Sequence, residues 1–236
     1  MNKACPKIIV EACRKMTDLF NLRGDDLTIA RSNSRAVNQF PHEWRMATYS
    51  FNYLPMLNES GKIDTQQAKL PAHLDMVEKI KEADEPIALV MTGPLTDLAR
   101  ALDVDPDIEK NIEKLYWMGG SLDGHGNVAM VNADGSQEWN SFWDPYAVKR
   151  VFESNIPIQM VGLESTEELP LNDELRQHWA SLRKYPAMDL IGQGYSLIVS
   201  IPSAELYLWD VLTTISALYP EVVETETAKA RVITDG

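Results

Sequence analysis

Residues 86–145 decide the fold: they begin PIALVMTGPLTDLARALDVDPDIEKNIEKLYWMGG at Pro86 and end QEWNSFWDP at Pro145. The apolar run Ile87–Met91 predicts a short buried strand, which stops at Thr92-Gly93-Pro94. A helix over Leu95–Leu102 is predicted directly after that turn. This order of strand, turn and helix is typical of α/β proteins.

The second half of this stretch repeats the same order. A strand is predicted over Lys114–Met118 and ends at Gly119-Gly120. Asp144 is predicted to cap a further helix, with Pro145 at the first helical position. In an open α/β sheet, ligands bind beyond the carboxyl ends of the strands. We therefore expect the polar residues that follow each strand to face the same edge of the sheet.

The remaining elements continue the alternation of strands and helices. We predict helices over residues 8–20, 74–83, 175–182 and 188–199, a helix or a strand-to-helix join over residues 206–218, and strands over residues 27–30, 156–161 and 230–234. Residues 31–45 are rich in Ser, Asn and Pro and are predicted to form a loop, and residues 46–71 are predicted to be irregular. No repeat, low-complexity tract or linker occurs. The prediction is a single α/β domain over residues 1–236, with a mostly parallel sheet flanked by helices and a Rossmann-like core.

Composition limits the class of partner. The 236-residue chain carries 22 Lys and Arg against 35 Asp and Glu, a formal net charge of −13. Such a surface repels polyanions, so a nucleic-acid polymer is not expected as a partner. No apolar run reaches the length of a membrane span, and Pro6, Lys7 and Glu11 interrupt the region where a signal peptide would be apolar. We therefore expect no membrane association and a cytoplasmic location.

Several catalytic classes lack their motifs in this sequence. It has no Gly-x-Gly-x-x-Gly, Walker, His-Glu-x-x-His or Gly-x-Ser-x-Gly pattern. The histidines, at positions 42, 73, 125 and 178, are dispersed and do not have metal-binding spacing. Cys5 and Cys13 are expected to be small apolar residues on or near a helix, because two cysteines at this spacing make neither a disulfide framework nor a metal site.

Oxygen-bearing residues are what remains for chemistry. They follow predicted strands or begin predicted helices: Thr92, Asp97, Asn127, Glu138, Asn140 and Asp210. Such a set suits a hard cation, because calcium binds carboxylate and carbonyl oxygens together. It also suits a polyhydroxylated ligand, since carboxylates and carboxamides supply both acceptors and donors.

Structural alternatives exist for several of these residues. Asp97 lies in the first turn of a predicted helix, where we expect it to interact with the helix dipole. Glu138 and Asn140, taken alone, are equally consistent with a polar turn. The predicted loop carries three residues that either line a pocket or pin the loop to the surface: His42, Trp44 and Arg45.

Eight short motifs occur in a fixed order along the chain. The first five are TGPLTDLA from Thr92, WMGG from Trp117, GN from Gly126, EWN from Glu138 and DP from Asp144. The last three are IPI from Ile156, MVGL from Met160 and LWD from Leu208. This ordered set resembles the inosine–uridine-preferring nucleoside hydrolases. The resemblance covers most of the chain, and the order of the motifs makes it specific although each motif alone is weak.

The resemblance implies a calcium-dependent N-ribohydrolase that cleaves a nucleoside to ribose and free base. By this resemblance, Thr92 would give a main-chain carbonyl and Asp210 a carboxylate to calcium. The ribose-binding residues would be Met118, packed under the sugar, and Asn127, Glu138 and Asn140, bound to its hydroxyls. The transition state of this reaction is an oxocarbenium ion, so the enzyme must fix the ring and stabilise positive charge near it. Calcium would hold the attacking water and lower its pKa.

Trp209 directly precedes the implied calcium ligand Asp210. Pyrimidine-tolerant members of the family often carry a histidine here that protonates the leaving base, and purine-specific members carry an aromatic residue that stacks on the base. Such stacking contributes about 1–3 kcal/mol. We therefore expect a purine nucleoside as substrate; core packing is the alternative role of Trp209. The resemblance also implies a role in nucleoside salvage, and the sequence leaves a homo-oligomer open.

The chain departs from the family at both ends. Family members begin with a strand ending in Asp-x-Asp-x-x-x-Asp-Asp, which supplies most calcium ligands and the general base, and this sequence has no such motif. The first strand–helix–strand unit is therefore expected to be missing, and the chain ends soon after Val232-Ile233. Two interpretations stay open. The chain is a piece of a working hydrolase, or it is a shortened, catalytically silent homologue that binds nucleoside or ribose or serves as a partner subunit through an uncovered sheet edge.

Overall fold

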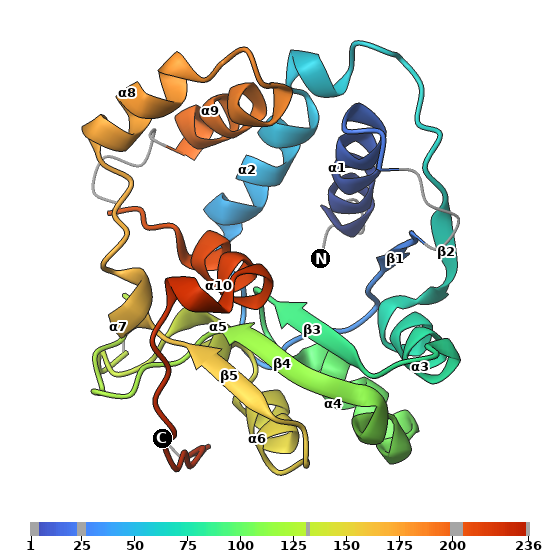
Figure 1. Cartoon of the computed structure of the whole chain (residues 1–236), viewed down its shortest axis with the longest axis vertical. Helices are drawn as coiled ribbons and strands as arrows, with labels where there is room; N and C mark the ends of the chain where they lie inside the picture. Colours follow the sequence, from blue (N-terminus) through green and yellow to red (C-terminus); the bar gives the residue numbers. More distant parts are fainter. Residues whose placement is uncertain (1–4, 23–26, 131–132, 199–204, 235–236) are drawn as a thin grey trace. The chain divides into compact units, whose positions relative to one another are not determined.

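The computed structural model describes residues 5–22, 27–130, 133–198 and 205–234. The chain forms two compact units (Figure 1). The first unit comprises residues 1–33, 40–72 and 171–206, and the second comprises residues 34–39, 73–170 and 207–236. The single domain that we expect from the sequence stays a prediction.

Three parallel strands form the sheet of the second unit: β3 (Ile87–Met91), β4 (Ile112–Met118) and β5 (Ile158–Val161), in the order β3-β4-β5. Met91 lies opposite Trp117 and Met118 lies opposite Val161, so the carboxyl ends of the strands are nearly level. All three arrowheads point to the same side in Figure 1. The segments that follow the strands therefore share one edge of the sheet, which confirms the α/β prediction.

Helices cover both faces of this sheet. They are α3 (Ala72–Glu82), α4 (Thr96–Val104), α5 (Trp139–Trp143), α6 (Pro145–Phe152), α7 (Leu163–Thr166) and α10 (Trp209–Leu218), with the 3-10 helices η2 (Pro106–Asn111) and η3 (Pro220–Val222). α4 packs against α6, whereas α10 packs against β4 and β3 and lies on the other face (Figure 1). Between these layers, apolar side chains such as Ile80, Leu98, Leu115, Trp117 and Val151 are almost fully buried in one core cluster. This core sets the position of the strand ends.

Two predictions for the second unit are wrong. Residues 230–234 are irregular rather than a strand; Val232 still packs against the core cluster. Ala230 and Ile233 are exposed, and no described strand pairs with this segment, so its strand-like composition is not enough to form a strand. Residues 139–143, expected to lie in a loop, form α5, which is too short for any helical periodicity to show in the sequence.

Helices dominate the first unit. Its elements are α1 (Cys5–Leu19), β1 (Ile29–Arg31), α2 (His42–Asn52), η1 (Pro55–Leu57), β2 (Gln67–Pro71), α8 (Asp173–Ser181) and α9 (Pro186–Ile198). Cys13 is half-buried on α1 as expected, and burial raises the pKa of its thiol. The side chain of Cys5 lies outside the described residues, as does Val199, the last residue of the predicted helix 188–199. Within the described ranges, no helix combines the length and the apolar character needed to cross a membrane.

Two segments of the first unit also differ from prediction. The predicted loop 31–45 ends at Pro41, because α2 begins at His42. α2 then continues into the segment that we predicted to be irregular. Contacts with α1 and α9 stabilise α2, and those contacts are distant in sequence. β2 is short, contains Gln67, Lys69 and Pro71, and pairs in parallel with β1. Trp44 packs edge-on against Phe40 at 5.8 Å between ring centres, while His42 is exposed.

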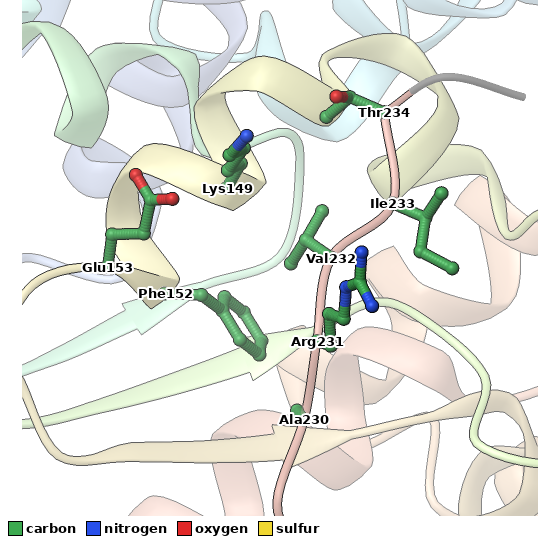
Figure 2. A pocket seen from close by; sticks show the side chains of 8 residues that line it. All are labelled: Lys149, Phe152, Glu153, Ala230, Arg231, Val232, Ile233 and Thr234. Carbon is green, nitrogen blue, oxygen red and sulfur yellow. The ribbon is translucent and has the colours of Figure 1, made fainter.

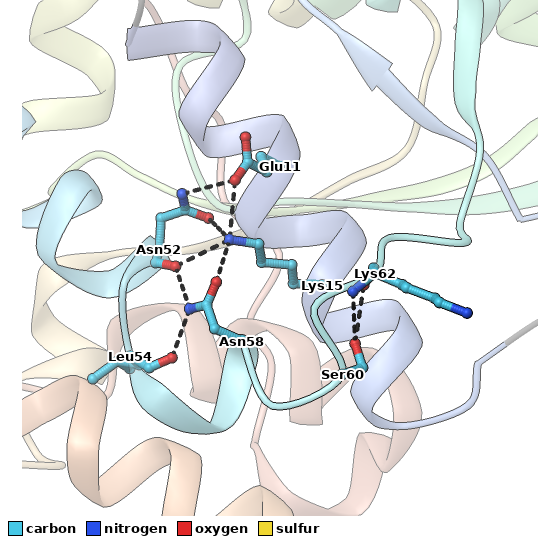
Figure 3. A network of polar contacts seen from close by, with 7 residues as sticks. All are labelled: Glu11, Lys15, Asn52, Leu54, Asn58, Ser60 and Lys62. Carbon is cyan, nitrogen blue, oxygen red and sulfur yellow. Dashed lines mark hydrogen bonds and ion pairs between the residues drawn. The ribbon is translucent and has the colours of Figure 1, made fainter.

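A buried lysine organises the polar interior of the first unit (Figure 3). The Lys15 ammonium forms an ion pair with Glu11 at 3.0 Å and donates to the side-chain oxygens of Asn52 at 3.1 Å and Asn58 at 2.8 Å. It also donates to the Asn52 main-chain oxygen at 3.3 Å. Only 8% of the Lys15 side chain is exposed. The ammonium therefore connects α1 to the end of α2 and to the turn after η1.

Candidate functional site

The carboxyl end of β4 carries a cluster of hydrogen-bonded polar side chains. Met118, the last residue of β4, is 2% exposed. The Asn140 side chain donates to the Met118 main-chain oxygen at 3.0 Å and lies 3.4 Å from its sulfur. Asn127 accepts a hydrogen bond from the Trp139 main-chain N–H at 3.1 Å. Glu138 directly precedes Trp139 in the chain. Four of the expected residues therefore lie in one cluster: Met118, Asn127, Glu138 and Asn140.

Glu138 holds this cluster together through main-chain groups. One carboxylate oxygen accepts from the Asn140 N–H at 2.8 Å, and the other accepts from the N–H groups of Gly120 at 2.9 Å and Ser141 at 3.0 Å. The residue is 3% exposed and is the N-cap of α5. Burial raises the pKa of Glu138, and the hydrogen bonds from these N–H groups oppose the rise only in part. Rather than lying in a plain turn, Glu138 fixes the end of β4 to the start of α5.

Two amide groups of the cluster each use only one end in the described hydrogen bonds. Asn140 uses its nitrogen on Met118, and Asn127 uses its oxygen on Trp139. Among the described residues, the Asn140 amide oxygen and the Asn127 amide nitrogen have no hydrogen-bond partner in the protein. One acceptor and one donor can therefore meet hydroxyl groups at this edge.

Asp210 lies in the first turn of α10, the helix that packs against β4 and β3. Its side chain opens to solvent, yet the surrounding protein raises its pKa to about 6, first through desolvation and second through the negative charge of Glu138. The negative charge of Glu138 thus disfavours ionisation of Asp210. The place of Asp210 in the candidate site stays a prediction.

Trp209 precedes Asp210 and is half-buried. Its ring packs against Tyr207, with 5.6 Å between ring centres and 63° between ring planes. The indole nitrogen is buried and has no hydrogen-bond partner among the residues that the structure describes. Trp209 therefore keeps one donor uncommitted.

The expected metal ligands are sparse. Thr92 directly follows β3 and is exposed. It lies in neither a strand nor a helix, so its carbonyl is not part of either. Within the described part of the chain, no group of three or more His, Cys, Asp or Glu side chains could hold a metal ion. Calcium takes about six to eight oxygen ligands. The carbonyl of Thr92 and the carboxylate of Asp210 do not make such a set, so these residues alone do not fit a calcium ion.

Two aspartates at the starts of helices make structural contacts, and Asp144 is the N-cap that the sequence predicts. Asp144 caps α6 by accepting from the Ala147 N–H at 3.1 Å, and it also accepts from the Thr96 hydroxyl at 2.7 Å. Asp97 lies in the first turn of α4 and accepts a hydrogen bond from the Ser34 hydroxyl. These bonds fix the helices that follow β3 and precede β5.

Sequence reasoning missed two residues that shape the site loops. Gly120 has a φ of +78°, which favours glycine, and its N–H binds Glu138. Glu164 accepts from the Ser121 hydroxyl at 2.8 Å and from the Leu122 N–H at 2.6 Å, which fastens the loop after β4 to α7. The Gly119-Gly120 pair was a visible signal for a turn, but no pattern in the sequence links Glu164 to that loop.

A groove lies elsewhere on the second unit, between α6 and the last described residues (Figure 2). Its volume is about 330 Å³, and its lining is Lys149, Phe152, Glu153 and residues 230–234. None of the expected site residues lines it. Its chemistry is therefore separate from that of the cluster at β4.

The raised pKa of Asp210 predicts a pH-dependent stability. Between about pH 4 and pH 6 the folded chain holds a proton at Asp210 that the unfolded chain releases, so this contribution to stability falls as pH rises through that window. The free energy of unfolding of Asp210→Asn, compared with that of the parent, should therefore rise by about 1 kcal/mol from pH 4.5 to pH 7. This value is reduced because the side chain is open to solvent. Urea unfolding at both pH values measures it. A constant difference, or an NMR titration midpoint of the carboxyl near 4, would contradict the prediction.

Comparison with known proteins gives consistent matches. The sequence model of a family described as inosine-uridine preferring nucleoside hydrolase matches residues 16–236. A crystal structure of such a hydrolase from Bacillus anthracis has a TM-score of 0.83 and 46% identity, over 90% of this chain and 68% of that chain. A purine-preferring ribonucleoside hydrolase from Gardnerella vaginalis has a TM-score of 0.69 at 24% identity, over 92% of this chain and 68% of that chain, and so shares the fold.

Curated relatives match a shorter region. A pyrimidine-specific ribonucleoside hydrolase RihA from Shewanella woodyi is 41% identical over 99 residues, which are 42% of this chain and 30% of that protein. The protein of the same name from an Enterobacter species is 42% identical over 91 residues, which are 39% of this chain and 27% of that protein. The matched region thus spans less than a third of these relatives.

Proposed function

Because the chain belongs to the inosine-uridine preferring nucleoside hydrolase family, we propose that it binds a nucleoside at the carboxyl end of β4 and hydrolyses the N-glycosidic bond to ribose and free base. One observation carries the proposal: Met118, Glu138 and Asn140 form a single buried cluster at that edge of the sheet. A strand-end cluster with uncommitted amide groups is where an α/β protein binds a hydroxylated ligand.

The proposed roles follow from the chemistry of each side chain. The Asn140 oxygen and the Asn127 nitrogen bind ribose hydroxyls, and Met118 forms the apolar floor under the sugar. Glu138 keeps these groups in place through its main-chain bonds. Asp210, with a pKa of about 6, is ionised near neutral pH, so its charge favours the oxocarbenium-like transition state. A carboxylate with such a pKa is also suited to accept a proton from water.

Calcium does not enter these steps. In the family's pattern, the Thr92 carbonyl and the Asp210 carboxylate would be two of the ligands, and bound calcium would supply charge and an activated water. The described residues do not offer the remaining ligands. The roles above are therefore those that the chain's own residues perform.

A second candidate function is nucleoside or ribose binding without turnover, by the chain alone or as a partner subunit. The lack of an acidic cluster among the described residues favours it, because a metal-assisted hydrolase needs such ligands. The same edge of the sheet would bind the sugar in either case. Turnover therefore separates the two candidates.

Inosine titration and release of hypoxanthine test both candidates on the full chain, with and without added calcium. We expect saturable inosine binding, release of hypoxanthine, and binding at least about tenfold weaker in Asn140→Ala, because a ligand that loses one hydrogen bond loses roughly this factor. Asn155→Ala is the control, since Asn155 precedes β5 at the opposite end of the sheet and bonds only Glu109 among the described residues. Binding without release supports the second candidate, and no binding at all contradicts both.

Trp209 supports a preference for purine nucleosides, and with it a role in nucleoside salvage. Base stacking on an aromatic ring contributes about 1–3 kcal/mol and grows with the area of the base, so inosine should bind more tightly than uridine. The names of similar proteins include both purine-preferring and pyrimidine-specific hydrolases, so they favour neither class of base. A substitution of Trp209 tests the preference directly.

Trp209→Ala should weaken inosine binding by about tenfold or more and remove the preference over uridine. Trp179→Ala is a matched control, because Trp179 lies on α8 and packs against Tyr195 at 5.5 Å between ring centres. Calorimetric titration of both nucleosides measures the ratio. An unchanged ratio in Trp209→Ala would leave core packing as the role of Trp209.

A further inference from the structure

We infer that Trp117 is a positioning residue for the candidate site, whose indole group fixes the loops that follow both β3 and β4. The inference rests on the proposed function only insofar as these two loops border the nucleoside. No motif of the sequence analysis assigned Trp117 a role of its own.

The first observation is a hydrogen bond between neighbouring strands. The Trp117 indole N–H donates to the Gly93 main-chain oxygen at 3.0 Å. Trp117 is opposite Met91 in the sheet, so its side chain reaches past the end of β3 into the turn Thr92-Gly93-Pro94. Since Trp117 is 1% exposed, water does not replace this bond if it breaks. The bond therefore holds the turn in one place relative to β4.

The second observation concerns the loop after β4. A Cβ atom at Gly119 would lie 2.3 Å from the Trp117 ring, so the glycine backbone rests directly on the indole. Gly119 leads into Gly120, whose N–H binds Glu138. Phe152 packs against the ring edge-on, with 5.8 Å between ring centres. The ring is thus held between α6 and the loop that carries the Glu138 bond.

An apolar side chain that only fills the core would make the contact with Gly119 but not the hydrogen bond to Gly93. Phenylalanine could fill most of the same volume and pack beside Gly119, but it has no N–H for Gly93. Burial alone explains an apolar side chain at position 117, whereas the bond to Gly93 requires a tryptophan donor. The distinguishing feature is therefore the indole nitrogen rather than the size of the ring.

Trp117→Phe tests this inference in the full chain, with Ile80→Val as a control of a small core loss on α3. Two measurements are made: hydrogen exchange of the main-chain amides in residues 92–97, and the dissociation constant for inosine. In Trp117→Phe we expect exchange in that segment to rise by about tenfold and inosine binding to weaken by about tenfold, a factor that corresponds to the loss of one buried hydrogen bond. Ile80→Val should change neither, although its thermal midpoint falls.

The outcomes separate the two proposals. If the parent does not bind inosine, the proposed function fails, and the exchange measurement still decides whether Trp117 holds the turn. Unchanged exchange in residues 92–97 overturns the positioning role whatever the binding shows. Should Trp117→Phe not fold, the exchange of the Trp117 indole N–H in the parent decides instead: slow exchange supports the bond to Gly93, and exchange as fast as that of an exposed indole overturns it.

Discussion

Glu138→Ala should lower the free energy of unfolding of the second unit by about 3–5 kcal/mol and abolish inosine binding. Glu138 accepts hydrogen bonds from the N–H groups of Gly120, Asn140 and Ser141, and it is 3% exposed. Alanine would leave these buried donors without an acceptor, at about 1–3 kcal/mol for each one that water does not reach. Binding fails as well, because Asn140 and the loop after β4 lose their common anchor.

Urea unfolding and inosine titration measure these two effects. Glu138→Gln keeps one acceptor oxygen, but its amide nitrogen would face a main-chain N–H donor. This variant should therefore lose about half as much stability as Glu138→Ala. The control is Glu113→Ala, an exposed glutamate on the same strand β4, which should stay within about 0.5 kcal/mol of the parent. A Glu138→Ala variant as stable as Glu113→Ala would show that the carboxylate does not hold the site.

Lys15→Met should destabilise the first unit by about 3 kcal/mol. The Lys15 ammonium satisfies Glu11, Asn52 and Asn58, and its removal leaves a carboxylate and two amide oxygens without their donor. Methionine has a similar volume, so the loss reports the polar contacts rather than a cavity. The ammonium also lowers the pKa of Glu11, mainly through their hydrogen bond. This contribution to the free energy of unfolding is therefore lost as pH falls below the ordinary pKa of a glutamate.

Thermal and urea unfolding at pH 7 and pH 4 measure this prediction. Lys62→Met is the control, because the Lys62 side chain is exposed and points away from the network in Figure 3. The difference between the two variants should be largest at pH 7 and smaller at pH 4, where more Glu11 is protonated. Equal stabilities at pH 7 would contradict the prediction.

Sequence alone predicted the fold where local pattern and burial agree. The apolar run Ile87–Met91 became β3 with the same bounds, because Ile87, Leu89 and Met91 pack against the core cluster. The expectation of a fully buried strand is wrong, since Ala88 and Val90 are exposed. α2 and β2 were missed because their stability comes from partners distant in sequence, namely α1, α9 and β1. Residues 230–234 show the reverse case: a strand-like composition without a neighbouring strand to pair with.

For the site, the structure joins residues that the sequence singled out, while their roles in binding stay a prediction. Met118, Asn127, Glu138 and Asn140 are joined by hydrogen bonds at the end of β4, and the charge of Glu138 acts on Asp210. The capping role of Glu138 was not predictable, because its partners are main-chain N–H groups, one of them 18 residues away in Gly120. Main-chain partners leave no signature in the residue types.

The bonds of Glu138 to the main chain have a consequence for how this protein can diversify. A peptide N–H is the same whichever side chain is attached, so a mutation at position 141 removes only the longer bond of the Ser141 hydroxyl to Glu138, at 3.4 Å, and keeps the main-chain bond. Gly120, in contrast, is constrained by its φ of +78°. Under the proposed function, a substitution at Trp209 would change the contacts with the base without changing this main-chain frame.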